Sequence, residues 1–197
     1  MPDIPVDIEP AFPQPIVGEA VRPKLLELLG LDDVPNEVDF TMDLPRQEGD
    51  LRVSGVRFTN SLGETVSGIL CMPQDAGEKL PGVVCVPGTA NSAELVSNRE
   101  FREEPSTGSL YGWGRELSRR GFATLSITVK GSVTRRASIE DWATENKLLA
   151  PYGRQQMGVI VEETLSAARI LASLEGVDPE RIGLTGWSLG GCATWYG

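Results

Sequence analysis

One serine near the end of the chain lies among glycines in a pattern that suits nucleophilic chemistry. Ser188 is the centre of Gly186-Trp187-Ser188-Leu189-Gly190-Gly191, which matches Gly-x-Ser-x-Gly. A serine hydroxyl in this pattern attacks acyl carbons once a base takes its proton. The pattern alone is weak evidence, because the chain contains 22 glycines. Its meaning depends on the elements around it.

Those elements have the order that a nucleophilic serine requires. Residues 181–185 are predicted to form a strand, and a helix is expected after Gly191. In such a strand–turn–helix the serine stands at a sharp, strained turn and projects above the sheet. Gly186 and Gly190 are then needed where the turn is crowded, and Gly191 lets the helix pack close to the sheet. The alternative, a plain helix N-cap at Ser188, is common for serine, but the context favours the nucleophile.

Two backbone N–H groups are expected to stabilise the oxyanion that forms when the serine attacks. The first belongs to Leu189, the residue after the nucleophile. The second should come from the loop after the buried strand at residues 83–86. There Thr89 is the first choice and Ala90 the next, because Pro87 has no N–H to donate.

The order of apolar runs predicts an α/β fold with a mostly parallel sheet and helices on both faces. Period-two alternation indicates a hairpin of two strands, wholly apolar runs indicate buried strands, and a 3.6-residue period indicates helices. The expected strands are 51–58, 65–72, 83–86, 122–129 and 181–185, and the expected helices are 24–31, 110–120 and 155–174. Met157 and Leu171 belong to the apolar stripe of the last helix, which we interpret as core.

The long polar connection at residues 130–153 should lie at the carboxyl end of the sheet, beside the serine. Arg135, Arg136 and Trp142 in it, and Trp187 in the turn, are candidate substrate contacts. The alternative, which we favour, is a solvated loop with one buried tryptophan.

Composition limits the remaining functions. The net charge is −10, which disfavours binding to nucleic acid or to anionic membranes. The chain has no histidine, and its three cysteines form no C-x-x-C pair, so no metal and no cofactor is expected. Cys71 and Cys85 lie in apolar runs and are predicted to be buried. The first residues do not form a signal peptide and no apolar run would cross a bilayer, so a cytoplasmic location is expected.

From Leu51 onward the chain resembles the α/β-hydrolase superfamily, and within it the dienelactone-hydrolase and acetyl-xylan-esterase-like group. The resemblance rests on residues 81–89, 110–122 and 177–191. It implies a serine hydrolase that acts on carboxylic esters through an acyl-enzyme on Ser188. Residues 1–50 lie outside it and are expected to form an arm with a short helix. Two departures stand out: Pro87 replaces the group's usual histidine, and no catalytic histidine or acid follows the nucleophile.

The resemblance therefore implies that residues 51–197 are a partial hydrolase domain, with the first five strands and the start of the nucleophile helix. Neither Lys130 nor an acidic residue has a spacing that favours it as the base. We expect the chain alone to be inactive and to need a second chain with the rest of the domain, or a homo-oligomer. A prolyl-oligopeptidase-like peptidase or a thioesterase is one alternative, and a non-catalytic ligand-binding protein of the same fold is another.

Overall fold

The fold was analysed in a computed structural model. It describes residues 14–31, 34, 36–75, 79–89, 91–106, 108–132, 134–135 and 144–197. Three of the candidate site residues, Ala90, Arg136 and Trp142, lie outside the described residues, as does most of the expected arm.

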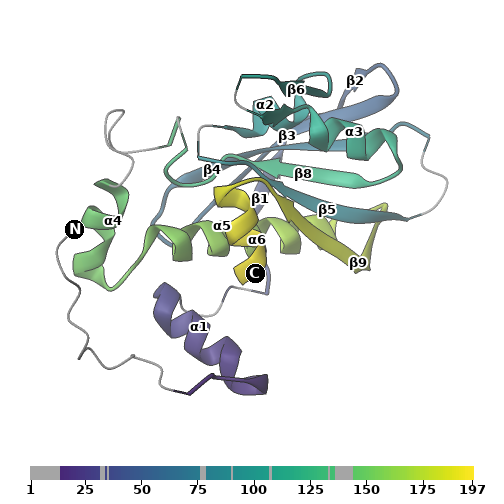
Figure 1. The fold of residues 1–197 in the computed structure, drawn as a ribbon. Coiled ribbons are helices and arrows are strands. Elements are labelled where there is room, and N and C mark those ends of the chain that lie inside the picture. The colour runs from purple at the N-terminus through teal and green to yellow at the C-terminus, as the bar shows by residue number, and fades with distance from the viewer. Residues whose placement is uncertain are drawn as a thin grey trace.

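A seven-stranded sheet forms the centre of the described chain (Figure 1). Its order is β1-β3-β4-β8-β5-β9, with β2 also paired to β3. β8, β5 and β9 are parallel, whereas β1 to β4 and the junction of β4 with β8 are antiparallel. The strands are β1 (Phe40–Met42), β2 (Arg46–Glu48), β3 (Leu51–Thr59), β4 (Thr65–Pro73), β5 (Leu80–Val86), β8 (Ala123–Ile127) and β9 (Val177–Gly186).

Helices cover both faces of this mixed sheet, which confirms the predicted α/β fold class, with parallel pairing in its β8, β5 and β9 part (Figure 1). α2 (Ala93–Ser97) and α3 (Trp113–Arg119) lie on one face. α5 (Gln156–Ser173) and α6 (Leu189–Tyr196) lie on the other, with α1 (Val21–Leu29) outside α5. The remaining elements are a small hairpin of β6 (Arg102–Glu104) and β7 (Ser109–Tyr111), helix α4 (Thr144–Leu149), and 3₁₀ turns at Gly18–Ala20 and Ala150–Tyr152.

The core lies where the predicted buried strands meet the long helix. All five residues of β8 are buried, and Val84 and Cys85 of β5 are inaccessible. From α5, Ile160 and Leu171 pack into the same cluster. Burying a side chain of this size contributes about 1.5–3 kcal/mol. The predicted core role of the α5 stripe is therefore confirmed, as is the burial of Cys71 and Cys85.

The structure corrects several expected boundaries. β1 and β2 form where no strand was predicted, and β7 begins where the helix at 110–120 was expected to start. α1 begins at Val21 instead of residue 24, and it ends at Leu29 because Gly30 adopts a left-handed conformation with φ of 62°. β9 starts at Val177, before the predicted strand at 181–185, and its pairing with β5 has a register shift between Pro81 and Gly82.

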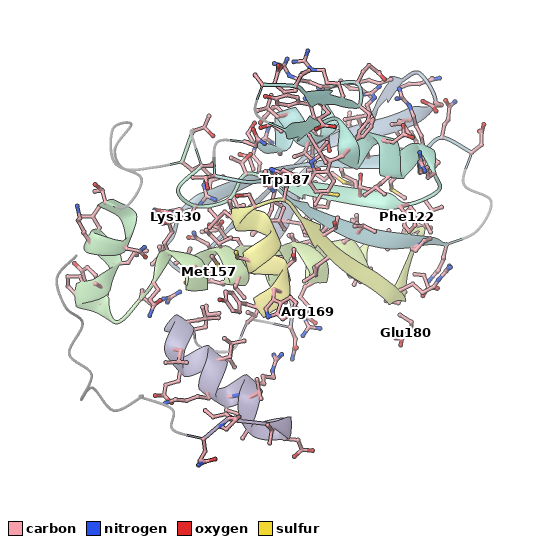
Figure 2. The ribbon with its side chains drawn as sticks, in the orientation of Figure 1. Phe122, Lys130, Met157, Arg169, Glu180 and Trp187 are labelled. Carbon is pink, nitrogen blue, oxygen red and sulfur yellow. The ribbon has the colours of Figure 1, made fainter. Side chains whose placement is uncertain are left out.

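The candidate site segments lie at the carboxyl ends of the parallel strands. Because β8, β5 and β9 are parallel, their carboxyl ends lie together. Figure 2 shows this polarity: Phe122 and Glu180 lie toward one end of these strands, and Lys130 and Trp187 lie toward the other. The outer edge of β9 pairs with no other strand in the described chain. None of the described helices is long and apolar enough to cross a membrane.

Candidate active site

Ser188 stands at a strained turn between β9 and α6. Its backbone has φ of 54° and ψ of −118°, and no other non-glycine residue in the described chain has a positive φ. Such a conformation costs about 1–3 kcal/mol and is characteristic of functional sites. Ser188 occupies the N-cap position, but its side chain makes no capping hydrogen bond. The plain N-cap alternative therefore does not explain this serine.

Backbone hydrogen bonds hold the turn against the end of β5. The N–H of Trp187 donates to the carbonyl of Val86 at 3.2 Å, and the N–H of Gly190 donates to the carbonyl of Trp187 at 3.0 Å. The first turn of α6 closes where Cys192 N donates to Ser188 O at 3.1 Å. The serine is thus fixed by its neighbours on two parallel strands.

The glycines of the motif differ in how strictly the turn requires them. A Cβ on Gly186 would overlap the backbone of Gly190, and a Cβ on Gly190 would overlap the carbonyl oxygens of Val86 and Pro87. These two positions fit the expected crowding. Gly191 does not, because a Cβ there would be 3.4 Å from the oxygen of Gly186, an ordinary contact. Close packing of the helix on the sheet is therefore not the reason for glycine at 191.

The loop after β5 lies directly beside the serine. A Cβ on Gly88 would be only 3.3 Å from Cβ of Ser188, and the N–H of Asn91 closes the loop on the carbonyl of Gly88 at 3.0 Å. Thr89, the predicted second oxyanion donor, is the next residue in this loop. The first predicted donor, Leu189, is the first residue of α6, where a backbone N–H has no acceptor within the helix. The structure therefore brings the two predicted donor segments together around Ser188.

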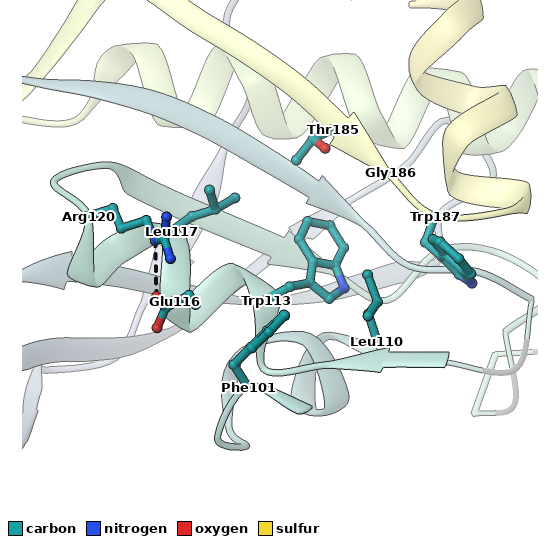
Figure 3. Close-up of a pocket in the computed structure, with 9 residues that line it drawn as sticks. All are labelled: Phe101, Leu110, Trp113, Glu116, Leu117, Arg120, Thr185, Gly186 and Trp187. Atoms are coloured by element: carbon teal, nitrogen blue, oxygen red, sulfur yellow. Dashed lines mark hydrogen bonds and ion pairs between the residues drawn. The ribbon is translucent and has the colours of Figure 1, made fainter. Parts of the chain in front are cut away.

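An apolar pocket of about 360 Å³ opens next to the turn. Trp187 forms one wall, and Trp113 of α3 and Leu110 of β7 lie opposite it (Figure 3). Trp187 is 42% exposed, and the Ser188 side chain does not line the pocket. The other lining residues are Phe101, Glu116, Leu117, Arg120, Thr185 and Gly186. Sequence reasoning identified only Trp187 as a wall residue, because short elements far away in the sequence supply Leu110 and Trp113.

Two basic residues of the 130–153 connection, Lys130 and Arg135, are held in a buried ionic cluster. The Arg135 guanidinium donates to both carboxylate oxygens of Glu163, at 2.8 and 3.0 Å. Lys130 Nζ donates to Glu64 at 2.6 Å. Burial acts to raise the pKa of Glu64, but the hydrogen bond and charge of Lys130 hold it below its ordinary value. As a substrate contact, Arg135 would have to give up partners that it already has.

The two buried cysteines, Cys71 and Cys85, are poor candidates for a nucleophile. Burial raises the pKa of Cys71 to about 11 and also raises the pKa of Cys85, so neither forms a thiolate readily. No hydrogen bond reaches the Ser188 hydroxyl from any residue that the structure describes. Over the same residues, no three His, Cys, Asp or Glu side chains gather as a metal site would require.

Comparison with known proteins gives one curated relative and several solved structures. No family model matches the chain. The chain is 30% identical over 104 residues to the Bacillus subtilis (strain 168) protein named "Putative hydrolase YtaP", a match that covers 53% of this chain and 32% of that protein.

The solved structures are more distant in sequence but match most of the chain. The "putative acetyl xylan esterase" of Bacteroides fragilis has a TM-score of 0.73 at 14% identity, with 89% of this chain and 47% of that one covered. Acetyl xylan esterase 1 of Thermoanaerobacterium has a TM-score of 0.61 at 16% identity, covering 89% and 51%. The glucuronoyl esterase of Solibacter usitatus has a TM-score of 0.61 at 12% identity, covering 89% and 53%.

The chain thus spans about half the length of these solved structures. The chain has the α/β-hydrolase fold, which it shares with these three solved structures.

Proposed function

We propose that the protein is a carboxylic ester hydrolase in which Ser188 is the nucleophile. The observation that carries this proposal is the backbone of Ser188, with φ of 54° at the strand-to-helix turn. A strained serine that does not cap its helix is expected where the hydroxyl itself reacts. The names of the solved neighbours, which are esterases, favour an ester over the peptide bond of a prolyl-oligopeptidase-like enzyme.

In the proposed reaction, Ser188 Oγ attacks the acyl carbon while its proton passes to a base. The carbonyl oxygen becomes an oxyanion, which accepts hydrogen bonds from the N–H groups of Leu189 and Thr89. The C–O bond to the alcohol then breaks, and the base returns the proton to the leaving oxygen. Water attacks the acyl-enzyme in the same way, which releases the carboxylic acid and restores the serine.

The base is the part of this scheme that the 197 residues do not supply. They include no histidine. We propose that polypeptide beyond these residues contributes the histidine and the acid, either in one longer chain or in a partner chain. It would pair with the edge of β9 that has no partner strand among the described residues, and it would cover the exposed Trp195 and Tyr196 of α6. An unpaired edge beside exposed aromatic side chains is a surface that proteins normally cover.

A fluorophosphonate probe tests the nucleophile directly. In the protein with all the sequence that naturally accompanies these residues, the probe should attach to Ser188, and Ser188→Ala should abolish both labelling and ester hydrolysis. Ser92→Ala is the matched control, because Ser92 is also a helix N-cap but has ordinary extended backbone, with φ of −136°. An intact, folded protein that the probe leaves unlabelled would instead support the non-catalytic binding alternative.

A further inference from the structure

A buried polar chain runs from α5 to the loop beside Ser188, and it begins at Glu163. This carboxylate is inaccessible to solvent. Its Oε1 accepts hydrogen bonds from Arg135 and from Asn60 Nδ2, both at 2.8 Å. Its Oε2 accepts from Arg135 at 3.0 Å and from the backbone N–H of Lys130 at 2.9 Å. A bidentate guanidinium pair in the interior fixes the geometry of both partners.

Arg135, held in place by Glu163, also bonds the backbone of Thr128, which lies just beyond the end of β8. The same guanidinium nitrogen that bonds Glu163 Oε2 also donates to the carbonyl of Thr128 at 2.7 Å. The Thr128 N–H donates to Ser67 O of β4 at 2.8 Å. Both backbone polar groups of Thr128 are therefore held, and its side chain is nearly inaccessible. Its hydroxyl has a fixed place in the fold.

The Thr128 hydroxyl in turn holds the loop after β5. Its Oγ1 accepts a hydrogen bond from the backbone N–H of Ala93 at 3.0 Å. Ala93 is the first residue of α2 and follows the loop that contains Gly88 and Thr89. β5 fixes the beginning of this loop, and the bond from Ala93 to Thr128 fixes its end. Between them, Asn91 N bonds Gly88 O at 3.0 Å.

From this arrangement we infer that Thr128 is a positioning residue for the second oxyanion donor, with Arg135 and Glu163 holding it in place. The inference rests on the proposed function. An oxyanion hole works because its donors are preorganised, and a displacement of about 1 Å can reduce the rate about 10²-fold. Arg135 therefore acts indirectly. It bonds Thr128, and Thr128 in turn bonds the end of the loop that would hold the oxyanion.

The test compares Thr128→Val with Thr128→Ser in the protein with all the sequence that naturally accompanies these residues. Valine has the shape of threonine but offers no acceptor to Ala93 N–H, whereas serine keeps the hydroxyl. With 4-nitrophenyl acetate, Thr128→Val should lower kcat about 10–100-fold and leave KM within about threefold. Thr128→Ser should retain most of the activity. Phenylboronic acid, which mimics the tetrahedral state, should bind Thr128→Val more weakly by a similar factor.

Hydrogen exchange provides a readout that does not need turnover. Amides of residues 88–89 and 91–97 should exchange faster in Thr128→Val, while those of α5 stay unchanged. If valine prevents folding, Thr128→Ala, which leaves room for a water at Ala93 N–H, replaces it in every measurement.

The outcomes separate the two proposals. If Ser188→Ala is inactive but Thr128→Val keeps wild-type kcat and boronate affinity, the positioning role is overturned and the hydrolase function stands. A loss in Thr128→Ser equal to that in Thr128→Val would also overturn it. Activity that survives in Ser188→Ala would overturn the proposed function itself.

Discussion

Gly190 and Gly191, which follow the turn at Ser188, should change the stability of the protein in opposite directions when each is replaced by alanine. In Gly190→Ala the new methyl group would overlap the backbone oxygens of Val86 and Pro87, the latter at 2.6 Å. Backbone oxygens at the end of a central strand cannot turn aside as a side chain can, so α6 must shift away from β5. In Gly191→Ala the new methyl group has only an ordinary contact at 3.4 Å.

The magnitudes follow from two opposing terms. Alanine in place of glycine stabilises a helix by up to about 1 kcal/mol, and this gain is similar at both positions. Overpacking costs about 1–3 kcal/mol, and it applies only at Gly190. We therefore expect Gly190→Ala to lose up to about 3 kcal/mol and Gly191→Ala to gain up to about 1 kcal/mol. For a domain of this size, 1 kcal/mol corresponds to about 2–4 °C in Tm.

The assay is thermal unfolding of the protein with all the sequence that naturally accompanies these residues. Both variants are measured beside the wild type. Gly190→Ala should also reduce fluorophosphonate labelling, because a displaced α6 carries Ser188 with it. Equal melting temperatures for the two variants would refute the reasoning, since the difference between them isolates the packing term. A Gly191→Ala variant that is the less stable of the two would refute it as well.

Three further outcomes are expected. Ser188→Gly should be about 1 kcal/mol more stable than Ser188→Ala in thermal unfolding, because only glycine relieves the strain at φ of 54°; equal stability would contradict that strain. The hydrogen bond from Arg115 lowers the pKa of Glu48 below its ordinary 4.5, so the stability from this pair is complete above pH 4.5 and is lost as pH falls through the folded pKa. Glu48→Gln should flatten that acid loss in melts measured over a pH series, and an unchanged slope would count against the pairing. The isolated 197-residue chain should aggregate, as measured by light scattering, and should not hydrolyse 4-nitrophenyl acetate in an absorbance assay. Trp195→Ser should reduce the aggregation, because the Trp195 side chain is 86% exposed. A cooperative, monomeric melt of that chain, or turnover by it, would refute this last expectation.

The sequence predicts the elements whose residues repeat a clear local pattern. β3 alternates over much of its length and β4 over its first four residues, β5 ends in an apolar run, β8 is buried throughout, and α5 carries a continuous stripe. Each pattern reflects burial on a regular element, so it can be recognised without knowing which element packs against it. The sharp turn at Ser188 is readable for the same reason, because its neighbours Gly186 and Gly190 have no room for a side chain.

The short strands and the side-chain pairs could not be predicted, because they depend on residues far away in the sequence. β1, β2, β6 and β7 are three residues each, too short for a period, and form where a neighbouring strand offers hydrogen bonds. Arg135 could be placed in a polar connection but not paired, because Glu163 is 28 residues away on a helix face that also looks apolar. The link from Thr128 to Ala93 joins a side chain to a backbone amide 35 residues earlier, and such a bond leaves no pattern in either segment.

The place of β5 in the sheet has a consequence for how the chain acquires its structure during synthesis. Its neighbours on both sides, β8 and β9, come later in the sequence, and β8 must insert between β4 and β5. The β3–β4 hairpin can form as soon as it leaves the ribosome, but β5 has no partner strand until residues 123–127 follow. Pairings between distant segments form slowly and leave strands exposed meanwhile. The loop after β5 is therefore among the last parts to become ordered, and the nascent chain is most vulnerable to misassembly before residues 123–127 are available to pair with β5.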